Sequence, residues 1–249
     1  MVVGDEPTNI NHSIALMLLG DTPTYYLPLQ RLEHELHESL IGYNDAVCAL
    51  FRIKTPSREQ QFVYSLPTAF GPTQRLFIQN DLPSLPVGLL DEEGRLQSLS
   101  KVMAHYPKKV LTIVKGRSYG PYLDEQLSLL DEHQRIEINT NSVPYLNARL
   151  FINKRTDFSV LFPDEIDEAS DGDSSDNYSS YAFSGAPALM TSHIACNKTP
   201  AGIAFVERIN QQLLALYKTR DFIDAHGDFY PEAEVVRIAQ EIEKYRLNH

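Results

Sequence analysis

The sequence is short of positive charge and contains no long apolar run. Its 249 residues include 22 Lys and Arg against 33 Asp and Glu, so the formal net charge is −11. This excess of negative charge disfavours binding to nucleic acid or to an anionic membrane over most of the surface. No run reaches the roughly 18 apolar residues that a membrane-spanning helix needs. Apolar residues make up 43% of the chain, which is typical of a folded globular protein.

Motifs of catalysis and of metal binding are also missing. Phe183-Ser184-Gly185 is preceded by alanine, so it is not a Gly-x-Ser-x-Gly nucleophile elbow. The histidines of the segment 34–38 are three apart, whereas zinc proteases need them four apart, and a solvated helix face is expected there. The segment 171–176 lacks the spacing and the closing glutamate of a calcium loop. We predict a protein that is not an enzyme and that holds neither a metal nor a cofactor.

Cysteine is scarce as well, because only Cys48 and Cys196 are present. Each lies in a short apolar run. From the residues alone, the pair fits either one disulfide or two buried free thiols.

The most informative stretch runs from Asp45 to Pro67. Its apolar run, Ala46–Phe51, is short enough to be a buried strand. Thr55 and Pro56 then suit the cap and the first position of a helix, and Arg58 adds a cation to the first turn. A guanidinium offers a planar fork of donors that matches a carboxylate. The pattern therefore predicts an anion-binding turn.

A second turn, residues 115–120 with the sequence Lys-Gly-Arg-Ser-Tyr-Gly, follows a β-branched strand predicted at 110–114. A strand, a glycine-bearing turn and a helix start can direct N–H groups at an anion. The turn lacks the Lys-Ser/Thr ending of a nucleotide phosphate loop and the three-glycine spacing of a dinucleotide fingerprint. The alternative is that Ser118 only caps the next helix.

Strands and helices alternate along most of the chain, which indicates βαβ units and a mainly parallel sheet. The alternation is interrupted near 80–86 and near 185–192, so we predict two α/β lobes with the second inserted into the first. The acidic, Ser-rich stretch Asp164–Ser180 is predicted as an exposed loop. The predicted helices are 10–19, 32–43, 98–105, 122–130, 143–152, 199–217 and 232–246, and further strands are predicted at 25–29, 62–65, 76–78, 136–138 and 157–162.

Three segments together resemble the family 3 periplasmic solute-binding proteins, the polar amino-acid binding group. They are Thr-Pro-x-Arg-Glu with Phe-x-x-Ser-x-Pro at 55–67, the turn at 115–120, and Ile-Ala-Cys-Asn-Lys-Thr-Pro-Ala-Gly at 194–202 with Ile209-Asn210. The resemblance implies an α/β, two-lobe, periplasmic-binding-protein-like (type II) fold with two crossover segments and a central cleft. Lobe I would comprise residues 1–82 and 190–249, and lobe II residues 83–189.

The resemblance also implies a function. The protein would capture a small polar ligand, anionic or amino-acid-like, in the cleft for an ABC transporter, with a membrane permease as partner. It would be a periplasmic monomer. Because the N-terminus lacks the features of a secretion signal, we expect the signal peptide to have been removed. The alternatives are a sensor module that signals to a membrane protein, an enzyme on this fold, and a degenerate member that binds nothing.

Site residues follow from the same resemblance. The arginine matching Arg58 clamps the ligand α-carboxylate beside Thr55; the alternative is a surface pair with Glu59 or Glu6. One departure is Ile53, where the family carries a small or hydroxyl residue, and this argues against an amino acid held in the usual way. The other candidate ligand residues are Arg117, Ser118, Tyr119 and Gly120 in the second turn, Asp5 and Glu6 after the first strand, and the aromatic residues Phe162, Tyr64 and Phe70.

For Asp5 and Glu6 the alternative is an exposed turn, and for the aromatic residues it is a place in the core. In the family fold, the strands that hold Cys48 and Cys196 are antiparallel neighbours. A cross-strand disulfide is then possible if the two Cα atoms lie within ~7 Å, and an oxidising compartment favours it. The alternative of two buried thiols stays open.

Overall fold

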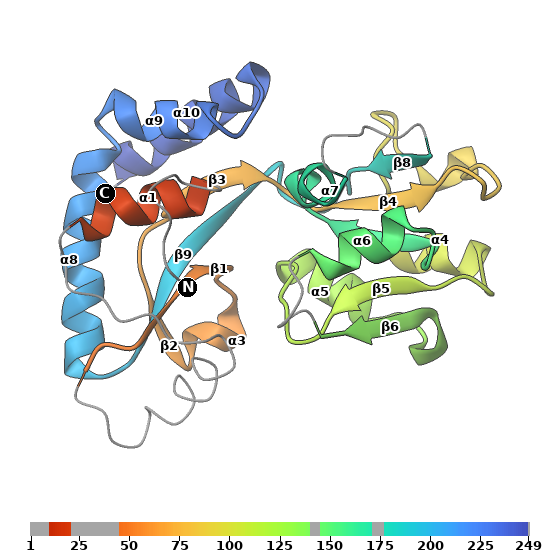
Figure 1. Ribbon diagram of the computed structural model, residues 1–249, viewed down its shortest axis with the longest axis horizontal. Coiled ribbons are helices and arrows are strands. Elements are labelled where there is room, and N and C mark those ends of the chain that lie inside the picture. Colours follow the sequence, from red (N-terminus) through yellow and green to blue (C-terminus); the bar gives the residue numbers. More distant parts are fainter. Residues whose placement is uncertain (1–9, 21–44, 140–144, 171–176, 249) are drawn as a thin grey trace. The chain divides into compact units, whose positions relative to one another are not determined.

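The computed structural model describes residues 10–20, 45–139, 145–170 and 177–248. The chain forms two compact units, each built around its own sheet (Figure 1). The first unit combines residues 1–71 with 189–249, and the second unit is residues 72–188. The second unit is therefore inserted into the sequence of the first, which is the organisation that the sequence predicts.

The first boundary lies earlier than the predicted one. Strand β4 (Arg75–Gln79), placed by the prediction in lobe I, pairs with two strands of the second unit. The prolines at 83 and 86 suggested a crossing near 80–86, but they lie in the connection between β4 and the short helix η1 (Val87–Leu89). The units divide at Gly71–Pro72 and at Ala188–Leu189.

The sheet of the first unit is centred on the long strand β9 (Leu189–Asn197). Strands β1 (Cys48–Arg52) and β2 (Phe62–Tyr64) pair with β9 antiparallel on its two sides. The short strand β3 (Ala69–Pro72) also pairs with β9. The described pairs of this unit are therefore not the parallel ones that the alternation predicted.

A disulfide joins β1 to β9. Cys48 lies opposite Cys196 in the register, and their Sγ atoms are 2.02 Å apart. Cys196 belongs to the buried core of the unit. The predicted disulfide is confirmed, and the alternative of two free thiols is excluded.

Four helices pack around this sheet. α1 (Ile10–Leu19) and α10 (Glu232–Asn248) fall where the sequence predicts them, and α8 (Pro200–Leu216) starts at the predicted cap, where Thr199 Oγ1 accepts a hydrogen bond from Gly202 N at 3.1 Å. α9 (Arg220–Gly227) was not predicted, because it is short and begins only three residues after α8 ends. The buried core includes Ile10, Ile14, Leu18, Val206, Ile209, Leu213, Phe222, Ile238 and Ile242.

The second unit has a five-stranded mixed sheet in the order β6-β5-β7-β4-β8. Its other strands are β5 (Leu111–Val114), β6 (Arg135–Ile138), β7 (Phe158–Leu161) and β8 (Tyr178–Tyr181). β5 is parallel to β6 and β7, whereas β4 is antiparallel to β7 and β8. The prediction of a mainly parallel sheet was wrong here too, because β4 lies between β7 and β8 and runs antiparallel to both.

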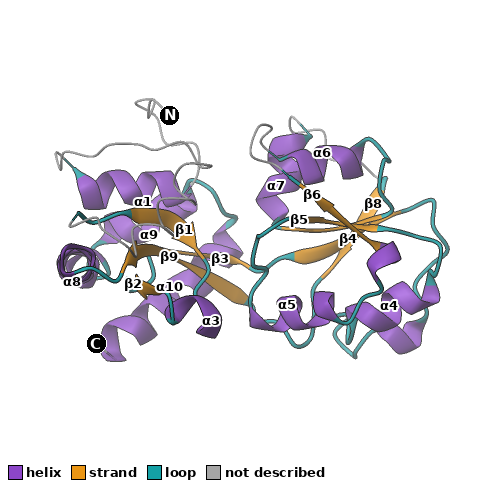
Figure 2. Cartoon of the chain, turned by 90° about the horizontal axis from the view of Figure 1, so that it is seen from below, coloured by secondary structure: helices purple, strands orange, loops and turns teal. Residues whose placement is uncertain are grey.

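Helices cover both faces of this sheet (Figure 2). α4 (Leu99–His105) and α5 (Pro121–Ser128) lie on one face, and α6 (Leu146–Ile152) and α7 (Pro163–Ala169) on the other. The side chains of β4 alternate accordingly: Leu76 and Ile78 belong to the core cluster with α4 and α5, and Phe77 to the cluster with α6 and α7.

The acidic stretch 164–180 is not the continuous loop that its composition suggested. Most of α7 and part of β8 lie within it. Pro163 occupies the first turn of α7, and Glu165 Oε2 accepts a hydrogen bond from Phe162 N at 2.8 Å. Ile166 is buried. The buried side chain of Ile166 and the capping carboxylate of Glu165 thus support a helix in a stretch whose acidic composition predicted a loop.

Several predictions fall outside the described residues. These are the strand at 25–29, the helix at 32–43 with its histidines, Asp5, Glu6, and the segment 171–176. Within the described part of the chain, no helix is both long enough and apolar enough to cross a bilayer.

The disulfide should stabilise the first unit selectively. Replacing both Cys48 and Cys196 by alanine removes a crosslink between residues 148 apart in sequence, and we expect the free energy of unfolding of that unit to fall by about 2–5 kcal/mol. Hydrogen exchange with peptide resolution in urea measures each unit separately. The peptides of residues 72–188 are the internal control, and an equal loss in both units would contradict the expectation.

His226 is a buried polar residue that ties α9 to β3. Its side chain is 0% exposed. Nδ1–H donates to Phe222 O at 2.7 Å, and Nε2 accepts from Phe70 N at 3.2 Å. Both ring nitrogens are therefore used by the neutral form, and burial lowers the pKa of His226 from 6.5 to about 4.

This shift predicts an acid-sensitive first unit. Above pH 6.5 the ring is neutral in both states, so it adds no pH dependence. Between pH 6.5 and about 4, the unfolded chain takes up a proton that the folded chain refuses, so stability falls with decreasing pH, by up to ~3 kcal/mol in total. Urea unfolding of the protein and of His226→Gln at pH 7, 6 and 5 measures the difference in slope. Equal slopes would contradict the prediction; His193, whose pKa is also lowered by burial, accounts for part of the remaining slope.

Candidate functional site

The predicted anion-binding turn of the first unit is α3 (Pro56–Glu59), which follows β1 directly. Thr55 caps it, because its Oγ1 accepts from Arg58 N at 3.4 Å, and Pro56 occupies the first turn. Arg58 is half-buried, and its Nη1 donates to Ile53 O at 3.3 Å. The guanidinium is thereby held beside the end of β1. The predicted cap, turn and cation are all present.

The alternative partner Glu59 is engaged elsewhere. Its Oε1 lies 2.7 Å from Lys54 Nζ, in an exposed ion pair. The other alternative partner, Glu6, lies outside the described residues. Glu59 thus has an ion-pair partner other than Arg58.

Tyr64 and His193 lie next to each other in the same unit. Their rings meet edge to face at 6.1 Å. Burial raises the pKa of Tyr64, and the positive charges of Arg58 and Arg52 oppose this rise, so both guanidinium groups act on the same hydroxyl. His193 Nδ1 contacts Ser65 O at 2.8 Å, and burial lowers its pKa, which keeps the ring neutral. The positive charges of this segment therefore act on an aromatic side chain, Tyr64.

The second predicted turn connects β5 to α5. Gly116 and Gly120 have φ of 73° and 90°, a region that favours glycine. Ser118 Oγ donates to Asp124 Oδ2 at 2.6 Å, and Tyr119 N donates to Asp124 Oδ1 at 2.7 Å. α5 begins at Pro121 with Gly120 as its cap, so Ser118 is not the cap residue of the alternative. The Asp124 carboxylate therefore accepts hydrogen bonds from Ser118 and Tyr119, which the sequence analysis assigned to a ligand.

Arg117 also has an internal partner. Nη1 and Nη2 donate to Glu165 Oε1 and Oε2 at 2.6 and 3.0 Å. The guanidinium lies over the rings of Tyr119 and Phe162, each at 5.2 Å. Burial would lower the pKa of Arg117, but the adjacent Glu165 carboxylate raises it above the ordinary value. This is a largely buried, bidentate ion pair between the β5–α5 turn and α7.

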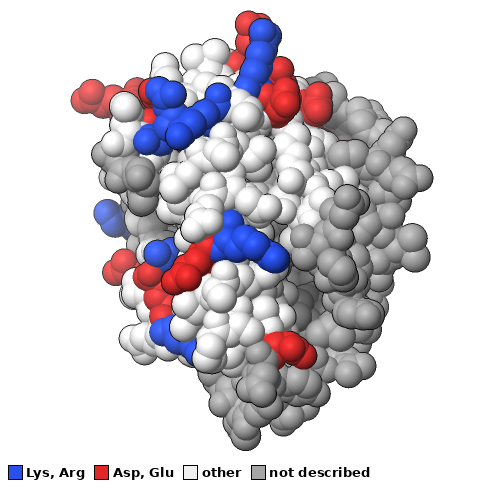
Figure 3. Space-filling view, turned by 90° about the vertical axis from the view of Figure 1, so that its left-hand side faces the viewer, with Lys and Arg blue, Asp and Glu red and all other residues white. Residues whose placement is uncertain are grey.

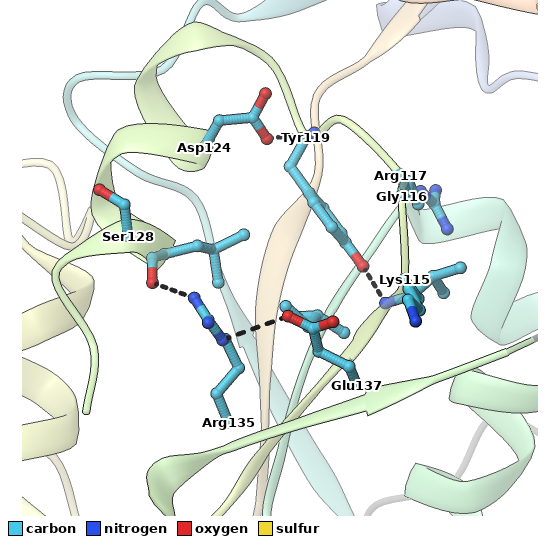
Figure 4. Close-up of a pocket in the computed structure, with 11 residues that line it drawn as sticks. Lys115, Gly116, Arg117, Tyr119, Asp124, Ser128, Arg135 and Glu137 are labelled. Carbon is cyan, nitrogen blue, oxygen red and sulfur yellow. Dashed lines mark hydrogen bonds and ion pairs between the residues drawn. The ribbon is translucent and has the colours of Figure 1, made fainter. Parts of the chain in front are cut away.

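A pocket of about 180 Å³ lies among β5, β6 and α5 (Figure 4). The Tyr119 side chain points into it and accepts a hydrogen bond from Val114 N at 2.8 Å. Arg135 donates to Leu127 O at 3.2 Å, and its Nε lies 3.6 Å from Glu137 Oε1. Lys115 at the rim is exposed and forms no ion pair with another described residue.

Sequence reasoning missed Arg135 and Glu137. They are two apart on β6, so they point to the same face of the sheet. This alternation was visible in the sequence, but β6 was predicted only as 136–138, which left Arg135 outside the strand. Among the predicted residues, Thr55, Arg58 and Tyr64 come together in the first unit, and Arg117–Gly120 with Phe162 in the second. Phe70 belongs to the buried core of the first unit, as its alternative held.

The face of the first unit that carries α8 has no continuous basic patch among its described residues (Figure 3). Charged side chains of both signs are scattered there and separated by a broad uncharged area. The exposed residues of α8 include Ile203, Ala204, Gln211, Gln212 and Ala215. Within the described ranges, no three His, Cys, Asp or Glu side chains are grouped so that they could bind a metal ion.

The Arg117–Glu165 pair gives a stability prediction. Glu165→Ala leaves the guanidinium largely buried without its anion, and we expect the second unit to lose about 3–5 kcal/mol of unfolding free energy. The matched variant, Arg117→Met with Glu165→Met, removes both charges and should recover most of that loss. Urea unfolding of the three proteins is the measurement. A double variant as unstable as Glu165→Ala would contradict this account.

Comparison with known proteins supports the fold. An ancestral arginine-binding protein bound to arginine is 14% identical with a TM-score of 0.61, and the match covers 89% of this chain and 88% of that chain. A structure from work on glutathione import through GshT and the cystine ABC importer TcyBC of Streptococcus mutans is 13% identical with a TM-score of 0.61, covering 89% and 85%.

A histidine kinase sensor domain with similarity to periplasmic binding proteins is 15% identical with a TM-score of 0.60, covering 88% of this chain and 85% of that chain. No family model and no curated protein sequence matches the chain. The chain has the fold of the periplasmic binding proteins, as the sequence resemblance implied. At these identities the similarity establishes the fold and not a ligand.

Proposed function

We propose that this chain is an extracytoplasmic solute-binding protein of the family 3 kind. It binds a small polar ligand with an anionic group and delivers that ligand to a membrane permease of an ABC transporter. The observation that carries the proposal is the capped turn at 55–59, where the Arg58 guanidinium is held beside the end of β1 by the Ile53 carbonyl. On a chain of net charge −11, such a site is a selective place for an anion.

The ligand is bound by Arg58 through a carboxylate or a similar oxyanion. A planar guanidinium offers a fork of N–H donors that matches two oxygens of a carboxylate, and in this structure Nη1 of Arg58 also donates to the Ile53 carbonyl. The side chain of Ile53 adds no hydrogen-bond donor or acceptor to the site. The proposal therefore favours an anionic ligand over an amino acid held by the usual set of contacts.

The second unit contributes the turn at 115–120. Asp124 holds the amide of Tyr119 and the hydroxyl of Ser118, so a ligand anion would have to displace that carboxylate to use them. Lys115, Arg117 and the aromatic residues Tyr119 and Phe162 complete the proposed set.

A second candidate function is a sensor module. It is favoured by the similarity to the histidine kinase sensor domain, which matches this fold as well as the binding proteins do. In this case the same site would bind the ligand, and the partner would be a signalling membrane protein. Co-purification with a permease or with a kinase, in the presence of ligand, distinguishes the two.

The test is a thermal-shift screen of the purified chain with small carboxylates, amino acids, amines and nucleotides. A ligand that binds only the folded state raises Tm by mass action. Arg58→Ala should abolish the rise for a carboxylate ligand, because no other group replaces the guanidinium fork. Arg237→Ala is the matched control, since it removes an exposed arginine of α10 in the same unit.

A carboxylate that still raises Tm by the full amount in Arg58→Ala would place the binding site elsewhere. A screen in which only amines bind would exclude the proposed anion site.

A further inference from the structure

The pocket among β5, β6 and α5 contains charged groups that the proposed function does not use (Figure 4). Arg135 and Glu137 lie on β6 and face the side of the sheet that α5 covers, because their register partners Leu111 and Ile113 belong to the core cluster on that side. The cavity measures about 180 Å³, which is less than the roughly 300–1,000 Å³ of a drug-sized site. It therefore suits a molecule of a few heavy atoms.

Arg135 is only partly engaged by the protein. Its Nη1 donates to Leu127 O at 3.2 Å, and its Nε lies 3.6 Å from Glu137 Oε1, which is too long for a hydrogen bond. A guanidinium has several more N–H donors, and those of Arg135 have no acceptor among the residues that the structure describes. Because only 25% of the side chain is exposed, these donors are held in place at the wall of the cavity and are available to an anion.

Two further donors line the same cavity. The Tyr119 residue is 2% exposed, and its hydroxyl accepts a hydrogen bond from Val114 N at 2.8 Å. Within the described ranges, nothing accepts the proton of that hydroxyl, and a buried donor without an acceptor costs free energy unless a group in the cavity takes it. Lys115, at the rim, is exposed and has no ion-pair partner in the described part of the chain.

One carboxylate of the cavity is also without a hydrogen bond. Both oxygens of Asp124 already accept from donors of the turn at 115–120. Glu137 forms no hydrogen bond with a described residue, and 43% of its side chain is exposed. The cavity thus presents positive charge from Lys115 and Arg135 beside negative charge from Glu137. A simple anion is repelled by the carboxylate and a simple amine by the two cations, whereas a molecule with both charges is complementary to all three.

We propose that this pocket binds a small zwitterion, with its carboxylate toward Arg135 and Lys115 and its ammonium group toward Glu137. The Tyr119 hydroxyl donates to the same carboxylate. Because Arg135 Nε and Glu137 Oε1 lie 3.6 Å apart, a molecule whose two charged groups are bonded to one carbon atom can contact both. The inference goes beyond the proposed function, since no residue of the first unit takes part and the two residues of β6 belong to this pocket alone.

The experiment uses three probes that differ by one charged group. L-Alanine carries both charges, propionate lacks the ammonium group, and ethylamine lacks the carboxylate. Each probe is titrated into the full chain while the amide signals are recorded by two-dimensional NMR, because the shifts both locate the site and give the affinity. We expect alanine to bind roughly fivefold more tightly than either partner, the increment of one partly exposed ion pair. The signals that should shift are those of residues 115–119, 127–128 and 135–137.

The decisive variant is Glu137→Gln, which removes the negative charge with little change of shape. It should weaken the binding of alanine and strengthen that of propionate, so that the order of these two probes is reversed. A purely structural role of the Arg135–Glu137 pair would not reverse it. Lys115→Gln should weaken alanine and propionate but not ethylamine. Glu125→Gln and Lys101→Gln, which replace exposed residues of α5 and α4, are the matched controls and should bind as the unmodified chain does. The amide spectrum verifies that each variant is folded.

Arg58→Ala should leave the shifts at 115–137 unchanged, because that residue belongs to the other unit. Shifts that disappear in Arg58→Ala, equal binding of alanine and propionate by the unmodified chain, or an unchanged order of the probes in Glu137→Gln would overturn the inference. The absence of shifts at 115–137 would overturn it as well. The proposed function fails on a different result, a carboxylate whose full effect on Tm survives Arg58→Ala.

Discussion

The pairing of β1 with β9 is the constraint on which the rest of the first unit depends. Cys48 and Cys196 fix its register on the core face, and a fixed register on one face also fixes the other, since side chains alternate. The bulge at Phe51 then changes which side chain the end of β1 presents. The Arg58 turn begins three residues after β1 ends, so the position of its cation depends on the same strand.

The second unit follows a different electrostatic principle. Its turn at 115–120 resembles an anion site, yet each donor that could bind a ligand has an internal carboxylate. Asp124 takes the donors of Ser118 and Tyr119, and Glu165 takes Arg117. These contacts hold β5, α5 and α7 together and keep the turn in one conformation. The turn at 115–120 is therefore internally neutralised, apart from Lys115.

Local signals in the sequence were sufficient for much of the fold. Capped helix starts such as Thr55-Pro56 and Thr199-Pro200 are encoded by adjacent residues, and β-branched runs mark the strands. Strand direction and the first unit boundary were not predictable in this way, because β4 joins the second sheet through partners about 80 to 100 residues away. For the candidate site, Arg58 could be read from the turn. Asp124 and Glu165 could not, since single carboxylates carry no distinguishing context.

The insertion of one unit into the other has a consequence for synthesis. Cys48 leaves the ribosome or the export channel 148 residues before Cys196. Residues 72–188 are synthesised before β9, so the inserted unit can fold first. At that stage the earlier strands of the first unit still lack the central strand of their sheet. During that interval β1 has no central strand to pair with, and its thiol is free to react with other thiols. The sheet and the disulfide of the first unit can therefore form only after the inserted unit has been made.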